Sequence, residues 1–395
     1  MRISERAQCI EPFFVMEMAK TAQALAERAA GTDRPMIFLN IGEPDFSAPP
    51  AVQAAATRAI ESGQTQYTQA LGLPALRQAI SQWYQGRWGL SVDPSRIAVT
   101  AGASAALSLT CMALFGRDDE VLMPDPCYPC NRHFITAADA SARLIPSGPA
   151  QRFQLSAEQV RQHWTERTRG VLLASPSNPT GTSVEPAEMA RIHQAVRERD
   201  GVLVVDEIYL GLSHDDTLGQ TALRLGEDVI SINSFSKYFH MTGWRLGWVV
   251  LPTELVSVFE RLAQHLFICP STIAQQAALA CFEPATLAVY EARRAEFKAR
   301  RDAFIPALNA LGLTVPVMPD GAFYAWADCS AWCERLGLPD SWAFAHAMLE
   351  HAHVAATPGR DFGAADVVRY IRFSTASSMP QLMQAIERLR QWLRP

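Results

Sequence analysis

The stretch NSFSKYFHMTGWRLGW, residues 233–248, holds one lysine, Lys237, and one arginine, Arg245, in a segment that otherwise reads as buried. Serines precede the lysine, and Trp244 and Trp248 lie close to the arginine. Charged side chains are seldom buried unless a partner or a function keeps them there. The segment therefore predicts a special role for its ammonium group.

Short apolar runs lie on both sides of this stretch, and most of them end in Gly, Pro, Asp or Ser. They are residues 96–102, 120–126, 169–176, 201–209, 228–236 and 245–252. Continuous runs of this kind favour strands buried on both faces of a mainly parallel sheet. Helical patterns at 103–115 and 186–200 alternate with the runs, which predicts an α/β fold with helices flanking a seven-stranded type of sheet.

The sequence pattern changes after about residue 255, where helical periodicity replaces the short apolar runs. Two later runs, 321–330 and 367–377, read as strands, and a last helix begins near residue 380. We therefore expect a large domain over 45–290 and a smaller α+β domain over 291–395, joined by the N-terminal arm 1–44. The boundary should fall within a helix.

Composition narrows the class of protein. Of 395 residues, 49% are hydrophobic and 19% are charged, so the chain can form a sizeable core. The net charge of -5, with no basic block, argues against nucleic acid or a membrane surface as the main partner. No secretory signal opens the sequence, and no apolar run reaches the ~20 residues that a membrane span requires. These features predict a cytoplasmic protein.

Eight cysteines are present, two of them in the CxxC of Cys127 and Cys130, with His133 nearby. A CxxC can serve redox chemistry or form half of a zinc site. No second CxxC accompanies this one. Buried thiols are the more common explanation, and we predict no metal.

Chemistry in open parallel sheets gathers at the carboxyl ends of the strands. In this chain those ends are small, polar or charged: residues 102–104, 125–128, 175–181, 206–209 and 234–237. Each has an ordinary explanation by itself, such as a turn former, a helix cap or a core aromatic. Together they bring an amide, an acid, a phenol, hydroxyls and a lysine to one crevice.

That set suits pyridoxal phosphate. Lys237 can hold its aldehyde as a Schiff base, and apolar surroundings favour the neutral amine. Asp206 can hold the ring nitrogen protonated, so that the ring acts as an electron sink. Asn178 and Tyr209 can bond the ring oxygen, and Tyr128 can stack on the ring.

The phosphate of this cofactor needs cations and amide groups. Arg245 can donate two hydrogen bonds from its planar guanidinium, and Ser234 can donate one from its hydroxyl. Ala103 and Ser104 begin a predicted helix, and the first N–H groups of a helix favour an anion. The lysine is then buried because the cofactor occupies it covalently.

The pattern SFSKxxxMTGWRxG, with SNPTG at 177–181, Asp-x-x-Tyr at 206–209 and GEPDF at 42–46, resembles class I/II pyridoxal-phosphate-dependent aminotransferases of fold type I. The resemblance runs in the family's order to RFSTAS at 372–377 and covers nearly the whole chain. It implies that Lys237 is both the Schiff-base lysine and the proton shuttle. It implies the roles given above for Asp206, Asn178, Tyr209, Tyr128, Ala103, Ser104, Ser234 and Arg245.

The resemblance also implies residues beyond the crevice. Tyr67 is similar to a tyrosine that reaches the phosphate of the neighbouring subunit, which implies a homodimer with shared active sites. Arg372 matches the arginine that binds the substrate's α-carboxylate through two bonds, with the Gly42 backbone beside the same group. Strand alternation places Arg372 and Arg369 on opposite faces, and Arg369 remains the alternative if the register differs.

The substrate is less well defined by the sequence. The helix pattern after residue 103 carries no basic residue, and Phe13 and Phe14 lie where a small polar residue would help an acidic substrate. This pattern favours an alanine-like, apolar or aromatic amino acid. A second carboxylate, as in glutamate or 2-oxoglutarate, could still be received by Arg132, His133 or Arg360.

We therefore predict an amino-acid:2-oxo-acid aminotransferase. One alternative is other chemistry on the same scaffold, such as β-elimination at a carbon–sulfur bond. A different class is a regulator that binds the cofactor without turnover, but regulators of that kind usually append a DNA-binding domain. No helix-turn-helix pattern precedes residue 42.

Overall fold

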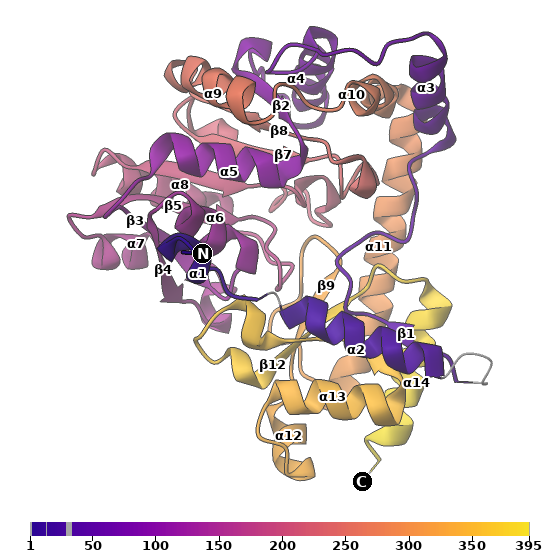
Figure 1. Cartoon of the computed structure of the whole chain (residues 1–395). Coiled ribbons are helices and arrows are strands. Elements are labelled where there is room, and N and C mark those ends of the chain that lie inside the picture. Colours follow the sequence, from indigo (N-terminus) through magenta and orange to yellow (C-terminus); the bar gives the residue numbers. More distant parts are fainter. Residues whose placement is uncertain (1, 13, 29–33, 395) are drawn as a thin grey trace.

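The computed structural model describes residues 2–12, 14–28 and 34–394 (Figure 1). Its central feature is a seven-stranded sheet in the order β2-β8-β7-β6-β5-β3-β4. The pairs among β4, β3, β5, β6 and β7 are parallel, whereas β8 is antiparallel to both of its neighbours. The strands are β2 (Ile97–Thr100), β3 (Glu120–Asp125), β4 (Ser141–Pro146), β5 (Thr168–Ala174), β6 (Val202–Asp206), β7 (Ile230–Ser234) and β8 (Gly247–Val250).

Both faces of this sheet are covered by helices, which explains its continuous apolar runs. Leu172 and Val204 pack in the cluster with α5 (Gly102–Leu114), α6 (Pro129–Ala137) and α9 (Thr253–Leu266). Leu173 and Val205 pack on the opposite side with α7 (Ala157–His163) and α8 (Pro186–Arg197). Consecutive strand residues thus alternate between two apolar cores, as the pleat of a strand requires.

Further helices pack at the β2 end of the sheet. They are α3 (Pro50–Glu61), α4 (Pro74–Trp88) and α10 (Thr272–Leu279). Together with the 235–248 region they form an aromatic cluster that includes Trp83, Phe239 and Trp248. The segment that contains Lys237 therefore packs within this aromatic cluster, through residues such as Phe235, Phe239 and Trp248.

A smaller unit contains the antiparallel sheet β11-β12-β9. Its strands are β9 (Tyr324–Asp328), β11 (Thr357–Pro358) and β12 (Tyr370–Ser374), and a two-stranded parallel pair joins β1 (Ile37–Phe38) to β10 (Val354–Ala355). Its helices are α12 (Ser330–Leu336), α13 (Ser341–Ala352) and α14 (Met379–Trp392). The N-terminal α2 (Phe14–Arg28) packs here as well, while the short α1 (Glu5–Gln8) contacts α6.

One long helix, α11 (Pro284–Ala310), runs between the two units (Figure 1). Its first half packs Tyr290 and Phe297 in the aromatic cluster, and its second half packs Phe304 and Leu308 in the core of the smaller unit. The predicted division near residue 290 falls inside this helix and stays a prediction.

The observed sheet contains one strand that the sequence pattern did not predict. β4 was not predicted, because it lies at the sheet edge and its residues are mostly half-exposed, with Arg143 among them.

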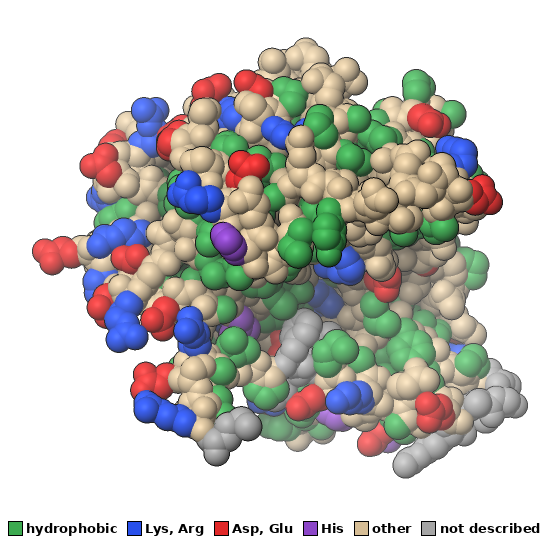
Figure 2. All heavy atoms as spheres, turned by 45° about the horizontal axis from the view of Figure 1, so that its top comes forward, with side chains coloured by type: hydrophobic (Ala, Val, Ile, Leu, Met, Phe, Trp, Pro, Cys, Tyr) green, Lys and Arg blue, Asp and Glu red, His purple; other side chains and the backbone are tan. Residues whose placement is uncertain are grey.

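Acidic and basic side chains are interspersed on the face shown in Figure 2. Among the described helices, none is long and apolar enough to cross a bilayer.

Candidate active site

A cavity of about 980 Å³ lies between the carboxyl ends of the large sheet's parallel strands and the small antiparallel sheet. Its walls contain eleven of the twelve residues predicted for the site: Gly42, Ala103, Ser104, Tyr128, Asn178, Asp206, Tyr209, Ser234, Lys237, Arg245 and Arg372. These residues come from positions 42 to 372 of the chain, so the fold brings together side chains that are distant in sequence.

Lys237 follows β7 and reaches into this cavity. Its Nζ donates a 2.6 Å hydrogen bond to the carbonyl oxygen of Gly42. Burial lowers the pKa of Lys237 to about 8, an effect that the nearby Glu43 carboxylate opposes. A larger share of the amine is therefore neutral near physiological pH than in an ordinary lysine, which suits a nucleophile.

Asp206 ends β6 and is 2% exposed. Burial raises its pKa to about 6, although the Ile208 N–H and the Asn131 side chain both bond to the carboxylate. A buried carboxylate of this kind is stabilised by a cation placed against it. A protonated pyridine nitrogen is such a cation, so the environment of Asp206 fits the ring of pyridoxal phosphate.

A cradle of small residues and donors forms the phosphate end of the cavity. Gly102 opens α5 with a φ of +80°, and a Cβ built there would lie 2.5 Å from Nη2 of Arg245. A larger residue at this position would therefore displace the guanidinium. The N-terminus of α5, with Ala103 and Ser104, and the guanidinium of Arg245 meet at one corner, together with Ser234. Helix amides and an arginine fork are the donors that phosphate groups favour.

Arg372 lies on β12 and is 4% exposed. Nη1 donates to Oδ1 of Asn178 at 2.7 Å, and Nη2 donates to the carbonyl oxygen of Asn40 at 2.8 Å. Its Nε has no hydrogen-bond partner among the described residues. A buried guanidinium with an unsatisfied donor, facing a cavity, is suited to bind a carboxylate.

Arg369 has a different environment. It lies outside the cavity and donates twice to Asp328 Oδ2, at 3.0 and 2.6 Å. The structure therefore brings Arg372, and not Arg369, to the predicted site.

Tyr209 and Tyr128 both face the cavity. The hydroxyl oxygen of Tyr209 lies 2.6 Å from that of Tyr324, and the two share a hydrogen bond. Burial is the main cause that raises the pKa of each phenol, including Tyr128, so all three stay protonated at neutral pH.

Tyr67 is the one predicted site residue that the cavity does not include. Its side chain is 80% exposed, in a shallow surface depression with Thr272 and Gln276. It therefore does not contribute to the cavity of its own chain.

The residues considered for a second carboxylate do not line the cavity either. Arg132 is held by Glu11 at 3.0 Å and by the Asp361 carbonyl oxygen at 3.0 Å. Arg360 stacks on Trp342, 4.7 Å from the ring centre. His133 lies on α6 with Arg132. Phe13 and the side chain of Phe14 lie outside the described residues.

Cys127 and Cys130 are free thiols, buried and half-buried. Burial raises the pKa of each, which disfavours the reactive thiolate. Among the described residues, no group of three or more His, Cys, Asp or Glu side chains is placed to hold a metal ion.

Two residues of the site were missed by the sequence reading. Asn131 bonds Asp206, and Tyr324 lies against Tyr209 and Arg372. Asn131 lies three residues past the strand-end motif 125–128, and Tyr324 was predicted only as part of a strand. Nothing in their local sequence distinguishes them, because their importance lies in contacts with distant segments.

The comparisons with known proteins agree with this geometry. Residues 34–389 match the family model described as aminotransferase class I and II. The chain is 36% identical to the valine–pyruvate aminotransferase of Mycobacterium tuberculosis, over 99% of this chain and 98% of that protein. It is 34% identical to a probable aspartate/prephenate aminotransferase of Aquifex aeolicus, over 94% of each chain. Its fold is similar to that of the aspartate aminotransferase of Thermus thermophilus with maleate, with a TM-score of 0.91 and 32% identity over 99% of this chain and 100% of that chain.

This chain belongs to the class I and II aminotransferase family. It is an aminotransferase with the aspartate-aminotransferase type of α/β fold, as the sequence predicted. Membership implies pyridoxal phosphate as the cofactor, with amino acids and 2-oxo acids as the substrates.

Proposed function

We propose that this chain is a pyridoxal-phosphate-dependent amino-acid:2-oxo-acid aminotransferase that uses an alanine-like, apolar or aromatic amino acid and exchanges its amino group with glutamate and 2-oxoglutarate. The observation that carries the proposal is the meeting of Lys237, Asp206 and Arg372 in one cavity. These three residues supply an amine, a buried carboxylate and a guanidinium with a free donor.

When bound, pyridoxal phosphate supplies an aldehyde that links to amines and a ring that accepts an electron pair. In our proposal Lys237 holds the aldehyde covalently and later moves a proton through Nζ, which its lowered pKa favours. Asp206 holds the proton on the ring nitrogen, and Asn178 and Tyr209 bond the ring oxygen. Tyr128 packs against the ring face.

The remaining residues of the proposal hold the ends of the two ligands. Arg245, Ser234 and the amides of Ala103 and Ser104 bind the phosphate and so fix the cofactor's orientation. Arg372 orients the substrate carboxylate, with the backbone of Gly42 beside it. Fixing both ends places the substrate amine close to Lys237, which lowers the entropic part of the barrier.

The choice of an apolar donor is supported by the walls of the cavity. The apolar residues that line the cavity include Met16, Ile41, Leu107 and Phe134. The cationic residues that line the cavity, within the described part of the chain, are Lys237, Arg245 and Arg372, and each already has a role in this proposal. This lining favours an apolar over an acidic side chain for the preferred amino donor.

We also infer a homodimer with shared sites. Support comes from Tyr67, which is 80% exposed. Ile41 and Ile268 are also exposed, at 49% and 51%. An exposed tyrosine of this kind suits a role in a neighbouring subunit, where its hydroxyl would reach the cofactor phosphate.

A donor screen by half-reaction tests the proposal. The loaded enzyme is mixed with alanine, valine, phenylalanine, aspartate or glutamate, and the cofactor spectrum is followed. We expect a faster change with the apolar donors than with aspartate, and full turnover when 2-oxoglutarate or pyruvate is added. With cysteine as the donor, release of sulfide, ammonia and pyruvate in place of stoichiometric exchange would instead indicate β-elimination. Lys237→Ala gives the background.

A further inference from the structure

Tyr324 contacts three parts of the candidate site. Its hydroxyl shares the 2.6 Å hydrogen bond with Tyr209, and its ring lies 4.5 Å from Cζ of Arg372. A Cβ on Gly42 would collide with the Tyr324 hydroxyl, so this approach requires glycine at position 42. Tyr324 therefore lies between the proposed cofactor-binding residues and the proposed carboxylate-binding arginine.

The two phenols hold two protons but share one hydrogen bond. Both are buried, and burial raises the pKa of each, so neither loses its proton at neutral pH. Whichever hydroxyl accepts the shared bond keeps its own proton free for a ligand. Within the described part of the chain, Tyr209 is the hydrogen-bond partner of the Tyr324 hydroxyl. Either hydroxyl can be the donor of this bond, and when Tyr324 donates it, the proton of Tyr209 is free to bond a group in the cavity.

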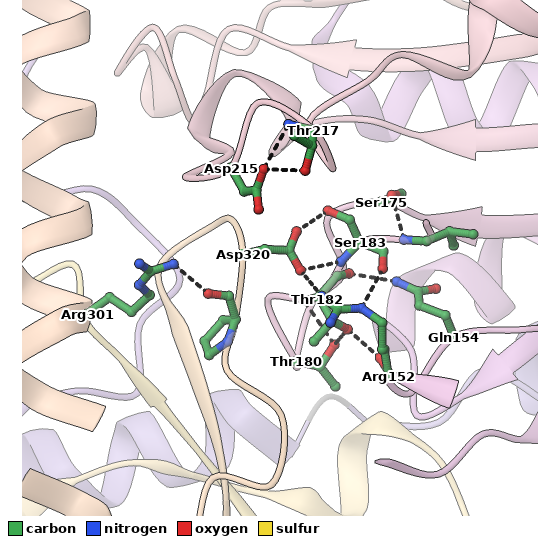
Figure 3. A network of polar contacts seen from close by, with 12 residues as sticks. Arg152, Gln154, Ser175, Thr180, Thr182, Ser183, Asp215, Thr217, Arg301 and Asp320 are labelled. Atoms are coloured by element: carbon green, nitrogen blue, oxygen red, sulfur yellow. Dashed lines mark hydrogen bonds and ion pairs between the residues drawn. The ribbon is translucent and has the colours of Figure 1, made fainter. Parts of the chain in front are cut away.

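A dense polar network fixes the segment before Tyr324 (Figure 3). The N–H groups of Asp320 and Gly321 each donate to the Gly181 carbonyl oxygen at 3.0 Å. The Asp320 carboxylate accepts from the Ser183 N–H at 3.0 Å, from the Ser183 hydroxyl and from Arg152. The loop that carries Asn178 is thereby joined to the strand that carries Tyr324.

From these contacts we propose that Tyr324 is a positioning residue with two separable actions. Its hydroxyl donates to Tyr209, which leaves the Tyr209 proton free to bond the ring oxygen of the cofactor. Its ring supports the guanidinium of Arg372 in the orientation that binds the substrate carboxylate. The inference rests on the proposed function, because it assigns an oxygen of pyridoxal phosphate as the acceptor of the Tyr209 proton.

Tyr324→Phe removes the first action and keeps the second. With the cofactor bound, a hydrogen bond donated to its ring oxygen would withdraw electron density and lower the pH midpoint of the cofactor's absorbance change. A hydroxyl that accepts one hydrogen bond is a stronger donor of the next, so loss of the Tyr324 hydroxyl should weaken the donation by Tyr209 and raise that pH midpoint by about 0.5–1 unit. The value of kcat should fall about 3–10-fold, with KM for both substrates changed less than about twofold.

Tyr324→Leu removes both actions. It should show the same direction of spectral shift and, in addition, an increase in KM for the amino acid and the oxo acid, because both present a carboxylate to Arg372. Near-UV circular dichroism of the loaded variants verifies that they are folded. Tyr324→Phe with KM raised as much as in Tyr324→Leu would contradict the separation of the two actions.

Tyr84→Phe is the matched control. Its hydroxyl is fully buried and accepts a 3.2 Å hydrogen bond from Trp248 Nε1, but it does not line the cavity. It should lower thermal stability and leave the spectral midpoint unchanged. An unchanged midpoint in Tyr324→Phe, with wild-type kcat, would overturn the inference alone. Failure of the wild-type chain to take up pyridoxal phosphate would overturn the proposed function together with this inference.

Discussion

Nη1 of Arg372 donates a 2.7 Å hydrogen bond to Oδ1 of Asn178, which joins residues 194 positions apart in sequence. Arg372 belongs to the small antiparallel sheet, and Asn178 lies in the loop after β5 of the large sheet. In the proposed function one binds the substrate and the other the cofactor. A shift of Arg372 on substrate binding would then act directly on Asn178, the proposed partner of the cofactor's ring oxygen.

Arg372→Lys should therefore weaken substrate binding. Lysine keeps the positive charge but lacks the planar fork, so it cannot replace both bonds to a carboxylate. We expect KM for the amino acid and for the oxo acid to rise about 10–100-fold together, as the loss of a charged hydrogen bond implies. Cofactor uptake should be unchanged, because Arg372 does not line the phosphate corner.

Arg369→Lys is the control for that experiment, since Arg369 pairs with Asp328 outside the cavity. It should leave KM close to wild type. A large increase in KM for Arg369→Lys, with KM of Arg372→Lys close to wild type, would show that Arg369 and not Arg372 binds the carboxylate.

Much of this site was accessible from sequence because its residues lie at the ends of apolar runs. Asp206 is the last residue of β6 and Lys237 lies three residues after the end of β7, and parallel strands bring their carboxyl ends to one edge of the sheet. The roles of Asn131 and Tyr324 could not be predicted, because both contact residues distant in sequence and such contacts leave no local pattern. The strand β4 (Ser141–Pro146) was not predicted for a different reason. It lies at the sheet edge, where polar residues are tolerated, and so it lacks the apolar run of a central strand.

Asp206→Asn should slow the chemical step. The substitution keeps the shape but removes the charge that would hold the ring nitrogen protonated. We expect kcat to fall at least ~10²-fold, equivalent to about 2.7 kcal/mol or more of transition-state stabilisation. Single-turnover kinetics measure this loss, and a variant as fast as wild type would place the essential carboxylate elsewhere.

The lowered pKa of Lys237 predicts a pH dependence of cofactor uptake. The neutral amine is the nucleophile, and its fraction increases as pH rises through the pKa of about 8. The rate at which the cofactor-free protein takes up pyridoxal phosphate should therefore increase between pH 7 and 9 and then level off. Stopped-flow absorbance measures it, and a rate still rising steeply above pH 10 would show an ordinary lysine.

Shared active sites predict that two defective chains can restore each other. Tyr67→Ala should bind pyridoxal phosphate more weakly, and Lys237→Ala should be inactive. In a mixed dimer, the Lys237→Ala chain would supply an intact Tyr67 to the site of the Tyr67→Ala chain. Mixing the two after mild dissociation should raise activity above that of either alone. No gain in mixtures that demonstrably exchange subunits would contradict a shared site.

The chain has three lysines, Lys20, Lys237 and Lys298, and this makes the central claim directly testable. Lys20 is exposed, Lys298 is 48% exposed beside Asp302, and Lys237 alone faces the cavity. The decisive measurement is borohydride reduction of the protein loaded with pyridoxal phosphate, followed by peptide mass spectrometry. The account predicts one phosphopyridoxyl group per chain, on Lys237, and none on that peptide in Lys237→Ala. A protein left unlabelled, or labelled on Lys20 or Lys298 in preference to Lys237, would contradict it.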